Sequence, residues 1–212
     1  MLYSFLRVLI RALLILINGN IHYDHQDRLP NQPYILVAPH RTWFDPVLFA
    51  LGTKRKFAFM AKEELFKNPI LRWILVHVHA FPVDRQNPGP SAIKVPVKIL
   101  KKGDDSLIIF PSGSRHSAEL KGGAIVIAKL AGVPLVPAVY QGPLTFMRLF
   151  SRKRITVSYG DPIYVDRKLK LTDENQKLIE DQMQESFDAL DKEIDPDWHY
   201  VDVTGQKHRT ID

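Results

Sequence analysis

The sequence predicts an α/β fold: a single layered domain with a mostly parallel or mixed sheet flanked by helices, preceded by an amphipathic membrane-associating helix. Short apolar or alternating segments of strand length alternate with helix candidates, which is typical of layered α/β domains. The chain has 212 residues, 45% hydrophobic and 25% charged, which suits one globular domain. The N-terminal segment is far more apolar than the rest. We therefore expect a membrane-associating helix over residues 1–20 and one folded domain over residues 21–212.

The N-terminal segment Leu2–Ile17 reads LYSFLRVLIRALLILI. As a helix it would reach about 24 Å at ~1.5 Å per residue, short of the hydrocarbon core of ~30 Å. Arg7 and Arg11 lie one helical turn apart, and Ser4 and Asn18 extend the same polar stripe. We expect this helix to lie in the membrane interface, with its arginines among lipid phosphates.

Three alternatives compete for this segment. Arginines interrupt the apolar run and no small-residue cleavage site follows, so a signal peptide is disfavoured. A single tilted membrane span and a core helix of a soluble domain remain open. The interfacial interpretation predicts a peripheral or monotopic protein on the cytoplasmic face of the cell membrane.

The remaining elements are predicted from hydrophobic periodicity and turn residues. The expected strands are Tyr34–Ala38, Phe57–Met60, Leu75–Phe81, Ser106–Phe110, Leu135–Val139 and Arg154–Tyr159. The expected helices are Pro46–Leu51, Ser91–Lys101, Gly123–Ala131 and a C-terminal helix over residues 172–194 with one face on the core. Pro96 is expected to kink or shorten the second helix. Residues from Asp195 onwards show no usable pattern.

Composition narrows the chemistry. The absence of cysteine excludes disulfides, thiolate nucleophiles and zinc sites that need cysteine. The formal net charge of +6 indicates anionic partners. Phosphorylated substrates, anionic lipid headgroups, acidic proteins and nucleic acid all fit this charge.

A candidate catalytic pair follows the first predicted strand, where residues 37–46 read VAPHRTWFDP. His40 stands at the carboxyl end of the strand, where α/β sheets place their chemistry, and Asp45 follows five residues later. An imidazole held by a carboxylate can deprotonate a hydroxyl near neutral pH. Asp45 before Pro46 also resembles a helix N-cap, and His40 alone would read as an exposed loop histidine. The HxxxxD spacing is therefore weak evidence by itself.

Further segments follow in a characteristic order: FPVDR at residues 81–85, FPSGSRHS at 110–117, LKGG at 120–123 and VPLVPAV at 133–139. With His40 and Asp45, this set resembles the glycerolipid acyltransferase family that contains the 1-acylglycerol-3-phosphate acyltransferases. The resemblance covers roughly residues 33–161, the motif core of an acyltransferase domain over 21–212. Each motif alone is weak, whereas the HxxxxD, FPVDR, FPSGSRHS and VPLVPAV motifs in this order are specific.

The resemblance implies transfer of a fatty acyl group from acyl-coenzyme A or acyl carrier protein to the sn-2 hydroxyl of lysophosphatidic acid, giving phosphatidic acid for phospholipid biosynthesis. Glycerol 3-phosphate or another lysophospholipid is the alternative acceptor. No cofactor and no metal are implied; the thioester is a co-substrate. The implied partners are the membrane surface, the lysophospholipid and the thioester carrier.

The resemblance also implies roles for individual residues. His40 is the general base, and Asp45 orients its imidazole. Arg85 and Arg115 hold the acceptor phosphate, for which the planar guanidinium fork is suited. Further positions are implied as follows: Lys62 and Lys121 as cations near the phosphate, and Gly113, Ser112 and Ser114 as positioning residues. Ser112 stands where the family has glutamate and Ser114 where it has threonine, which leaves the acceptor's identity open.

Other functional classes fit the sequence less well. His77 and His79 are expected to alternate on one strand face, but no third residue is spaced as a zinc ligand. A serine hydrolase lacks its GxSxG turn. A non-catalytic lipid or nucleic-acid binder would have no need of the HxxxxD pair, and nucleic acid is not expected as a partner because basic repeats interleaved with aromatic residues are absent.

Overall fold

A seven-stranded sheet forms the centre of the computed structural model, which describes residues 2–84, 89–112 and 122–201. Its strand order is β1-β7-β6-β2-β5-β3-β4, and every pairing is parallel except the antiparallel β6–β7 pair. The strands are β1 (Ile21–Asp24), β2 (Ile35–Val37), β3 (Lys56–Lys62), β4 (Ala80–Val83), β5 (Asp105–Ile109), β6 (Leu135–Gln141) and β7 (Ile155–Tyr159). The predicted α/β fold with a mostly parallel, mixed sheet is confirmed.

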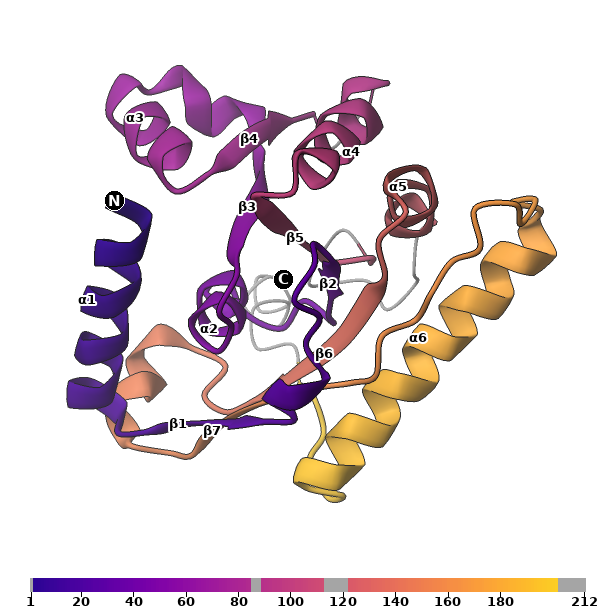
Figure 1. Cartoon of the computed structure of the whole chain (residues 1–212). Helices are drawn as coiled ribbons and strands as arrows, with labels where there is room; N and C mark the ends of the chain where they lie inside the picture. Colours follow the sequence, from indigo (N-terminus) through magenta and orange to yellow (C-terminus); the bar gives the residue numbers. More distant parts are fainter. Residues whose placement is uncertain (1, 85–88, 113–121, 202–212) are drawn as a thin grey trace, which may run out of the picture.

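Helices cover both faces of this sheet (Figure 1). The α-helices are α1 (Leu2–Asn18), α2 (Asp45–Leu51), α3 (Pro69–His77), α4 (Ser91–Lys102), α5 (Gly123–Ala131) and α6 (Asp173–Ile194). The 3-10 segments are η1 (Gln26–Arg28), η2 (Glu63–Lys67) and η3 (Phe146–Ser151). One hydrophobic core joins the sheet to α4, α5 and α6, and a second joins it to α2 and the inner side of α1.

Strand β2 lies at the middle of the sheet, between β5 and β6. Ile35 and Val37 belong to the first core and Leu36 to the second, and all three are fully buried. A strand buried on both faces reads as a continuous apolar run, which explains the YILVA segment. The loop that follows β2 therefore starts from a fully buried strand at the centre of the sheet.

The prediction of a strand over Leu75–Phe81 is wrong. Helix α3 occupies residues 69–77, His79 adopts a left-handed conformation with φ 63°, and β4 begins only at Ala80. Asn68 starts the helix: its side-chain oxygen accepts from the backbone N–H of Ile70 at 3.0 Å and of Leu71 at 3.1 Å. An apolar run cannot distinguish a short helix from a strand, whereas this capping asparagine can.

Of the two effects expected of Pro96, a kink or a shorter helix, the shortening is wrong. Helix α4 continues through Pro96 to Lys102 and ends at Gly103, whose φ of 89° is left-handed. Pro96 is the sixth residue of α4, inside the helix, where proline removes one intrahelical N–H donor. Leu100 and Pro96 are both buried, and this packing offsets the loss.

Candidate active site

His40 and the other motif segments follow parallel strands. His40 comes three residues after β2 ends, Ser112 three residues after β5, and Asp84 directly after β4, while Lys62 is the last residue of β3. Strands β2, β5, β3 and β4 are neighbours and run parallel, so their carboxyl ends meet at one edge of the sheet. Crevices at this edge are the usual ligand sites of open α/β sheets.

The side chains of His40 and Asp45 meet in the turn between β2 and α2. Their Nδ1 and Oδ2 atoms are 3.2 Å apart, and Asp45 is fully buried. The carboxylate also accepts from the backbone N–H of Arg41 at 2.6 Å, the backbone N–H of Thr42 at 2.7 Å and the Thr42 hydroxyl. An ionised carboxylate accepts several hydrogen bonds at once, so Asp45 holds the turn and the imidazole together.

The interpretation of Asp45 as a helix N-cap is wrong. Phe44 occupies the cap position and Asp45 is the first residue of α2, with Pro46 directly after it. Its carboxylate turns back to the residues before it rather than to the N–H groups of the helix. The Asp45 carboxylate therefore binds His40 and the backbone of its turn instead of capping α2.

Phe110 fixes the other side of the imidazole. The rings of His40 and Phe110 are stacked, with centroids 4.1 Å apart and planes at 24°. Phe110 opens the FPSGSRHS segment, so this contact joins that motif to the HxxxxD pair. With Nδ1 donating to Asp45, the Nε2 atom carries the lone pair that can accept a proton.

Tyr140 packs behind this turn. Burial, together with the nearby charge of Asp45, raises the pKa of Tyr140, so its hydroxyl stays protonated. That hydroxyl donates to the carbonyl of Pro143 at 2.7 Å. Tyr140 also supplies the backbone carbonyl that accepts from Arg41 at 2.6 Å.

The other predicted site residues are described only in part. Ser112 is buried beside Phe110, and Lys62 is exposed at the end of β3. Arg85, Gly113, Ser114, Arg115 and Lys121 lie outside the described residues. Their phosphate-binding and positioning roles therefore stay predictions.

Sequence reasoning missed the structural roles of Arg41, Thr42 and Phe110 around His40 and Asp45. Arg41 and Thr42 lie within the HxxxxD segment, and Phe110 begins a motif, so their positions were a usable signal. Asp191, which pairs with Arg41, lies in a helix whose sequence gives no such signal.

The two histidines weighed as zinc ligands do not share a strand face, so that expectation is wrong. His77 ends helix α3 and its Nδ1 contacts the carbonyl of Trp73 at 2.7 Å. His79 Nδ1 lies 2.7 Å from an Asp105 oxygen. Within residues 2–84, 89–112 and 122–201, no group of three or more His, Asp or Glu side chains could hold a metal ion.

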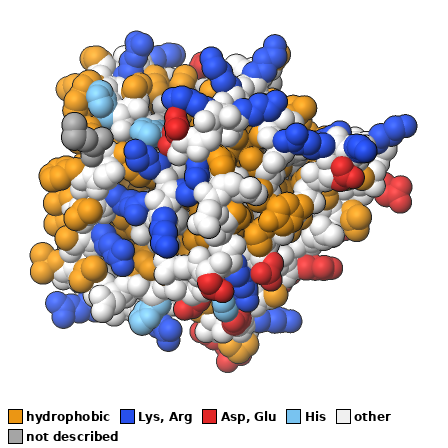
Figure 2. Space-filling model, in the orientation of Figure 1, with side chains coloured by type: hydrophobic (Ala, Val, Ile, Leu, Met, Phe, Trp, Pro, Cys, Tyr) orange, Lys and Arg blue, Asp and Glu red, His pale blue; other side chains and the backbone are white. Residues whose placement is uncertain are grey.

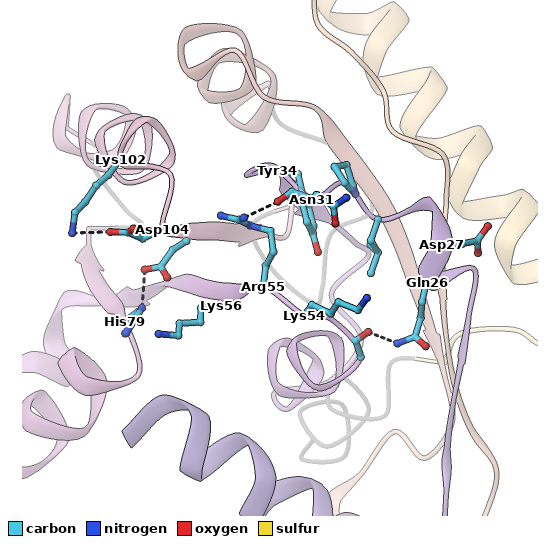
Figure 3. A pocket seen from close by; sticks show the side chains of 14 residues that line it. Gln26, Asp27, Asn31, Tyr34, Lys54, Arg55, Lys56, His79, Lys102 and Asp104 are labelled. Carbon is cyan, nitrogen blue, oxygen red and sulfur yellow. Dashed lines mark hydrogen bonds and ion pairs between the residues drawn. The ribbon is translucent and has the colours of Figure 1, made fainter. Parts of the chain in front are cut away.

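A cleft of about 930 Å³ opens at the opposite side of the sheet, where the parallel strands begin (Figure 3). Its lining includes Lys56 and Asp105, the first residues of β3 and β5. Arg55 lies across it, bound to the carbonyls of Asn31 at 2.8 Å and Gly103 at 2.6 Å. The described site residues, which follow the carboxyl ends of the strands, do not line this cleft.

Comparisons with known proteins agree with this geometry. A family model described as Acyltransferase matches residues 20–141. A 1-acyl-sn-glycerol-3-phosphate acyltransferase of Streptococcus pneumoniae is 51% identical over 202 residues, covering 94% of this chain and 76% of that protein. One of Bacillus subtilis is 38% identical over 166 residues, covering 77% of this chain and 83% of that protein.

A solved structure shares the fold. The crystal structure of the 1-acyl-sn-glycerophosphate (LPA) acyltransferase PlsC of Thermotoga maritima aligns with a TM-score of 0.70 and 21% identity, covering 93% of this chain and 81% of that one. The family model spans more than half of the sequence, and the pneumococcal relative is matched over three quarters of its length. The resemblance predicted from the motifs is confirmed: the chain belongs to the acyltransferase family.

Proposed function

We propose that this protein is a 1-acyl-sn-glycerol-3-phosphate acyltransferase, which moves a fatty acyl group from a thioester to the sn-2 hydroxyl of lysophosphatidic acid. The names of the pneumococcal and Bacillus relatives support this reaction. The observation that carries the proposal is the His40–Asp45 hydrogen bond of 3.2 Å, with the imidazole stacked on Phe110. The arrangement suits a general base for a hydroxyl.

The reaction needs one base and no covalent enzyme intermediate. Nε2 of His40 removes the hydroxyl proton as the oxygen attacks the thioester carbonyl. Asp45 stabilises the imidazolium that forms, since its carboxylate already faces Nδ1. When the tetrahedral intermediate collapses, the carbon–sulfur bond breaks and His40 protonates the departing thiolate.

The acceptor phosphate is assigned to Arg85 and Arg115, with Lys62 and Lys121 as further cations. Guanidinium groups bind phosphate oxygens in pairs, which would place the neighbouring hydroxyl beside His40. Ser112, Gly113 and Ser114 would shape the backbone at the substrate. Lys62 ends β3 at the carboxyl edge, which supports its share of this assignment.

We further propose that α1 and α3 dock the enzyme on the membrane. Large apolar side chains of these helices are exposed, among them Phe5, Val8, Leu16, Ile70 and Trp73. Figure 2 shows apolar side chains along the left edge of the molecule, where Figure 1 places α1 and α3. A membrane interface that buries the exposed apolar side chains of these two helices would gain the free energy of removing them from water.

The expected orientation of the Arg7 side chain is corrected by the structure. Arg7 turns toward the domain and contacts the carbonyls of Lys54 and Arg55, each at 3.5 Å, rather than facing outward. In the part of the chain that is described, no helix combines the length and apolarity that a membrane span requires. The proposed docking is therefore through the apolar outer face of α1, with the helix lying in the interface.

The donor is a thioester of coenzyme A or of acyl carrier protein. Both carriers are anionic, and the net charge of +6 would speed their encounter with the enzyme. Assays with each donor against lysophosphatidic acid, glycerol 3-phosphate and other lysophospholipids would identify both substrates. The proposed acceptor predicts that lysophosphatidic acid gives the highest kcat/KM.

The decisive variant is His40→Ala, with His22→Ala as the matched control, because His22 is exposed on β1 at the edge of the sheet. We expect His40→Ala to lose nearly all turnover while still binding lipid vesicles, and His22→Ala to keep its turnover. If the wild-type protein bound vesicles but acylated no acceptor, a non-catalytic lipid-binding role would replace the proposal.

A further inference from the structure

Arg41, the neighbour of His40 in sequence, forms an ion pair with Asp191 of helix α6. Its guanidinium donates to the Tyr140 carbonyl at 2.6 Å, to Asp191 Oδ1 at 3.0 Å and, through Nη2, to Asp191 Oδ2. The ring of Trp198 covers the guanidinium carbon, which lies 4.4 Å from the ring centroid. Arg41 is only 8% exposed, so the pair is largely desolvated. Because both carboxylate oxygens accept from the guanidinium, it is also bidentate.

Asp191 is fixed in turn. It lies in the last turn of α6, and the side chain of Gln141 donates both to its backbone carbonyl at 2.9 Å and to its Oδ1 at 3.0 Å. Gln141 is the last residue of β6 and is itself buried. The carboxylate thus receives donors from two sides, which fixes the direction in which it meets Arg41.

The backbone of Arg41 carries this geometry to the catalytic pair. Its N–H donates to Asp45 Oδ2 at 2.6 Å, the same oxygen that faces His40 Nδ1. Its carbonyl accepts from the Tyr200 hydroxyl at 3.4 Å. Arg41 is therefore fixed at its guanidinium by Tyr140 and Asp191 while its peptide N–H helps to orient the Asp45 carboxylate.

Helix α6 packs on the domain through several contacts besides this ion pair. Met183, Phe187 and Leu190 are buried in the core, and Glu193 makes a separate contact of 2.8 Å with His25. A buried ion pair is seldom more stabilising than an apolar pair of the same size. Its presence beside the catalytic turn is better explained by a requirement for orientation.

We propose that Arg41 and Asp191 are positioning residues for the His40–Asp45 pair, which makes the carboxyl end of α6 a part of the catalytic apparatus. The inference rests on the proposed acyltransferase reaction. General-base catalysis depends on placing the imidazole to within a fraction of an ångström, so loosening the Arg41 anchor lowers turnover without weakening substrate binding.

The test compares Asp191→Asn with Glu193→Gln in the full-length protein. Both remove one charge from the same turn of α6, but only Asp191 reaches the catalytic turn. We expect Asp191→Asn to lower kcat on the order of 10-fold or more, with KM for donor and acceptor within about twofold. Glu193→Gln should keep the wild-type kcat.

A conservative variant and a melting curve separate positioning from folding. Asp191→Glu keeps a carboxylate and is expected to recover part of the lost kcat. All three variants are assayed below their melting temperatures, so that unfolding does not account for a lower kcat. If Asp191→Asn kept the wild-type kcat, or Glu193→Gln lost as much, the positioning role would be refuted. Failure of the acyltransferase proposal would look different, since wild-type protein would then acylate no acceptor.

Discussion

At the residue scale, the turn that carries His40 depends on a carboxylate that accepts from several donors at once. Asp45 receives the N–H groups of Arg41 and Thr42, the Thr42 hydroxyl and the imidazole of His40. An amide in its place would offer one acceptor oxygen and would turn an NH₂ group toward donors. The turn and the imidazole tautomer therefore depend on the same charge.

Asp45→Asn should consequently abolish most activity while the chain still folds. We expect kcat to fall about 100- to 10,000-fold, the range seen when a general base loses its orienting carboxylate. We also expect a loss of about 1–3 kcal/mol in unfolding free energy, from the mismatched buried donors. Asp161→Asn is the control, because Asp161 is exposed. Steady-state kinetics and urea unfolding measure both effects, and an active Asp45→Asn enzyme would contradict the mechanism.

Phe110 supplies a second residue-scale prediction. Phe110→Leu removes the ring stacked on His40 but keeps an apolar side chain, so kcat should fall several-fold with little change in KM. Phe57→Leu is the matched control, since Phe57 is fully buried in the same core and its ring packs edge-on against Tyr34 rather than on His40. Both should lose about 1 kcal/mol of stability. Equal kcat values in the two variants would exclude a role for the stacking.

At the element scale, the proposed membrane docking accounts for the large apolar side chains that α1 leaves exposed. Val8 and Leu16 are 69% and 74% exposed, although Tyr3 and Asn18 of the same helix are buried. The helix is thus amphipathic with its polar stripe turned partly inward, where Arg7 meets the backbone of residues 54 and 55. In the proposed docking, α1 would place its apolar outer face in the membrane interface while its Arg7 side faces the domain.

A glutamate on this face should weaken membrane binding. We expect Leu16→Glu to lower the affinity for vesicles that contain phosphatidylglycerol on the order of 10-fold, because burying a leucine contributes about 1.5–3 kcal/mol and a charge opposes insertion. Leu178→Glu introduces the same charge on α6, where Leu178 is 59% exposed. Sedimentation with vesicles compares the two, and an equal loss in both variants would show that charge alone sets the affinity.

Elements with strong local signals were predictable, whereas two weakly marked ones were missed. The predicted strands at residues 34–38, 106–110 and 135–139 correspond to β2, β5 and β6, and the predicted helix at 123–131 has the bounds of α5. Strand β1 went unpredicted because it pairs only with β7 at the edge, where burial does not enforce an apolar pattern. Helix α3 was missed because its nine residues carry too short an apolar pattern, and the alternating residues 75–81, which include its last turn, predict a strand.

At the scale of the whole molecule, part of the site follows from topology and part does not. Parallel strands bring the loops after β2, β3, β4 and β5 to one edge, so ordered motifs could predict that His40, Lys62 and Ser112 share it. The Arg41–Asp191 pair joins positions 150 residues apart. Only the packing of α6 on β6 brings them together, and no local pattern encodes that contact.

The buried tyrosines give a prediction for the molecule as a whole. Burial raises the pKa of Tyr3, Tyr23, Tyr34, Tyr140 and Tyr159 above the ordinary value of 10.0. Below pH 10 both folded and unfolded tyrosines are protonated, so stability is unaffected. Above pH 10 the unfolded chain releases these protons while the folded chain must keep them, and stability falls as the pH rises.

A tyrosine that stays protonated in the folded chain lowers the unfolding free energy by at most about 1.4 kcal/mol per pH unit in this range, against a typical total of about 5–15 kcal/mol. The four tyrosines with the largest rise in pKa, Tyr23, Tyr34, Tyr140 and Tyr159, should therefore together unfold the domain within a few pH units above 10. Tyrosinate absorbance and circular dichroism, followed in parallel, should show the buried tyrosines ionising only as helicity is lost. Tyr140→Phe removes one of these groups and should reduce the steepness of the stability loss with pH. Ionisation of all the tyrosines in a chain that keeps its helicity would show that the second core admits hydroxide, and that the turn behind His40 is more open than its packing indicates.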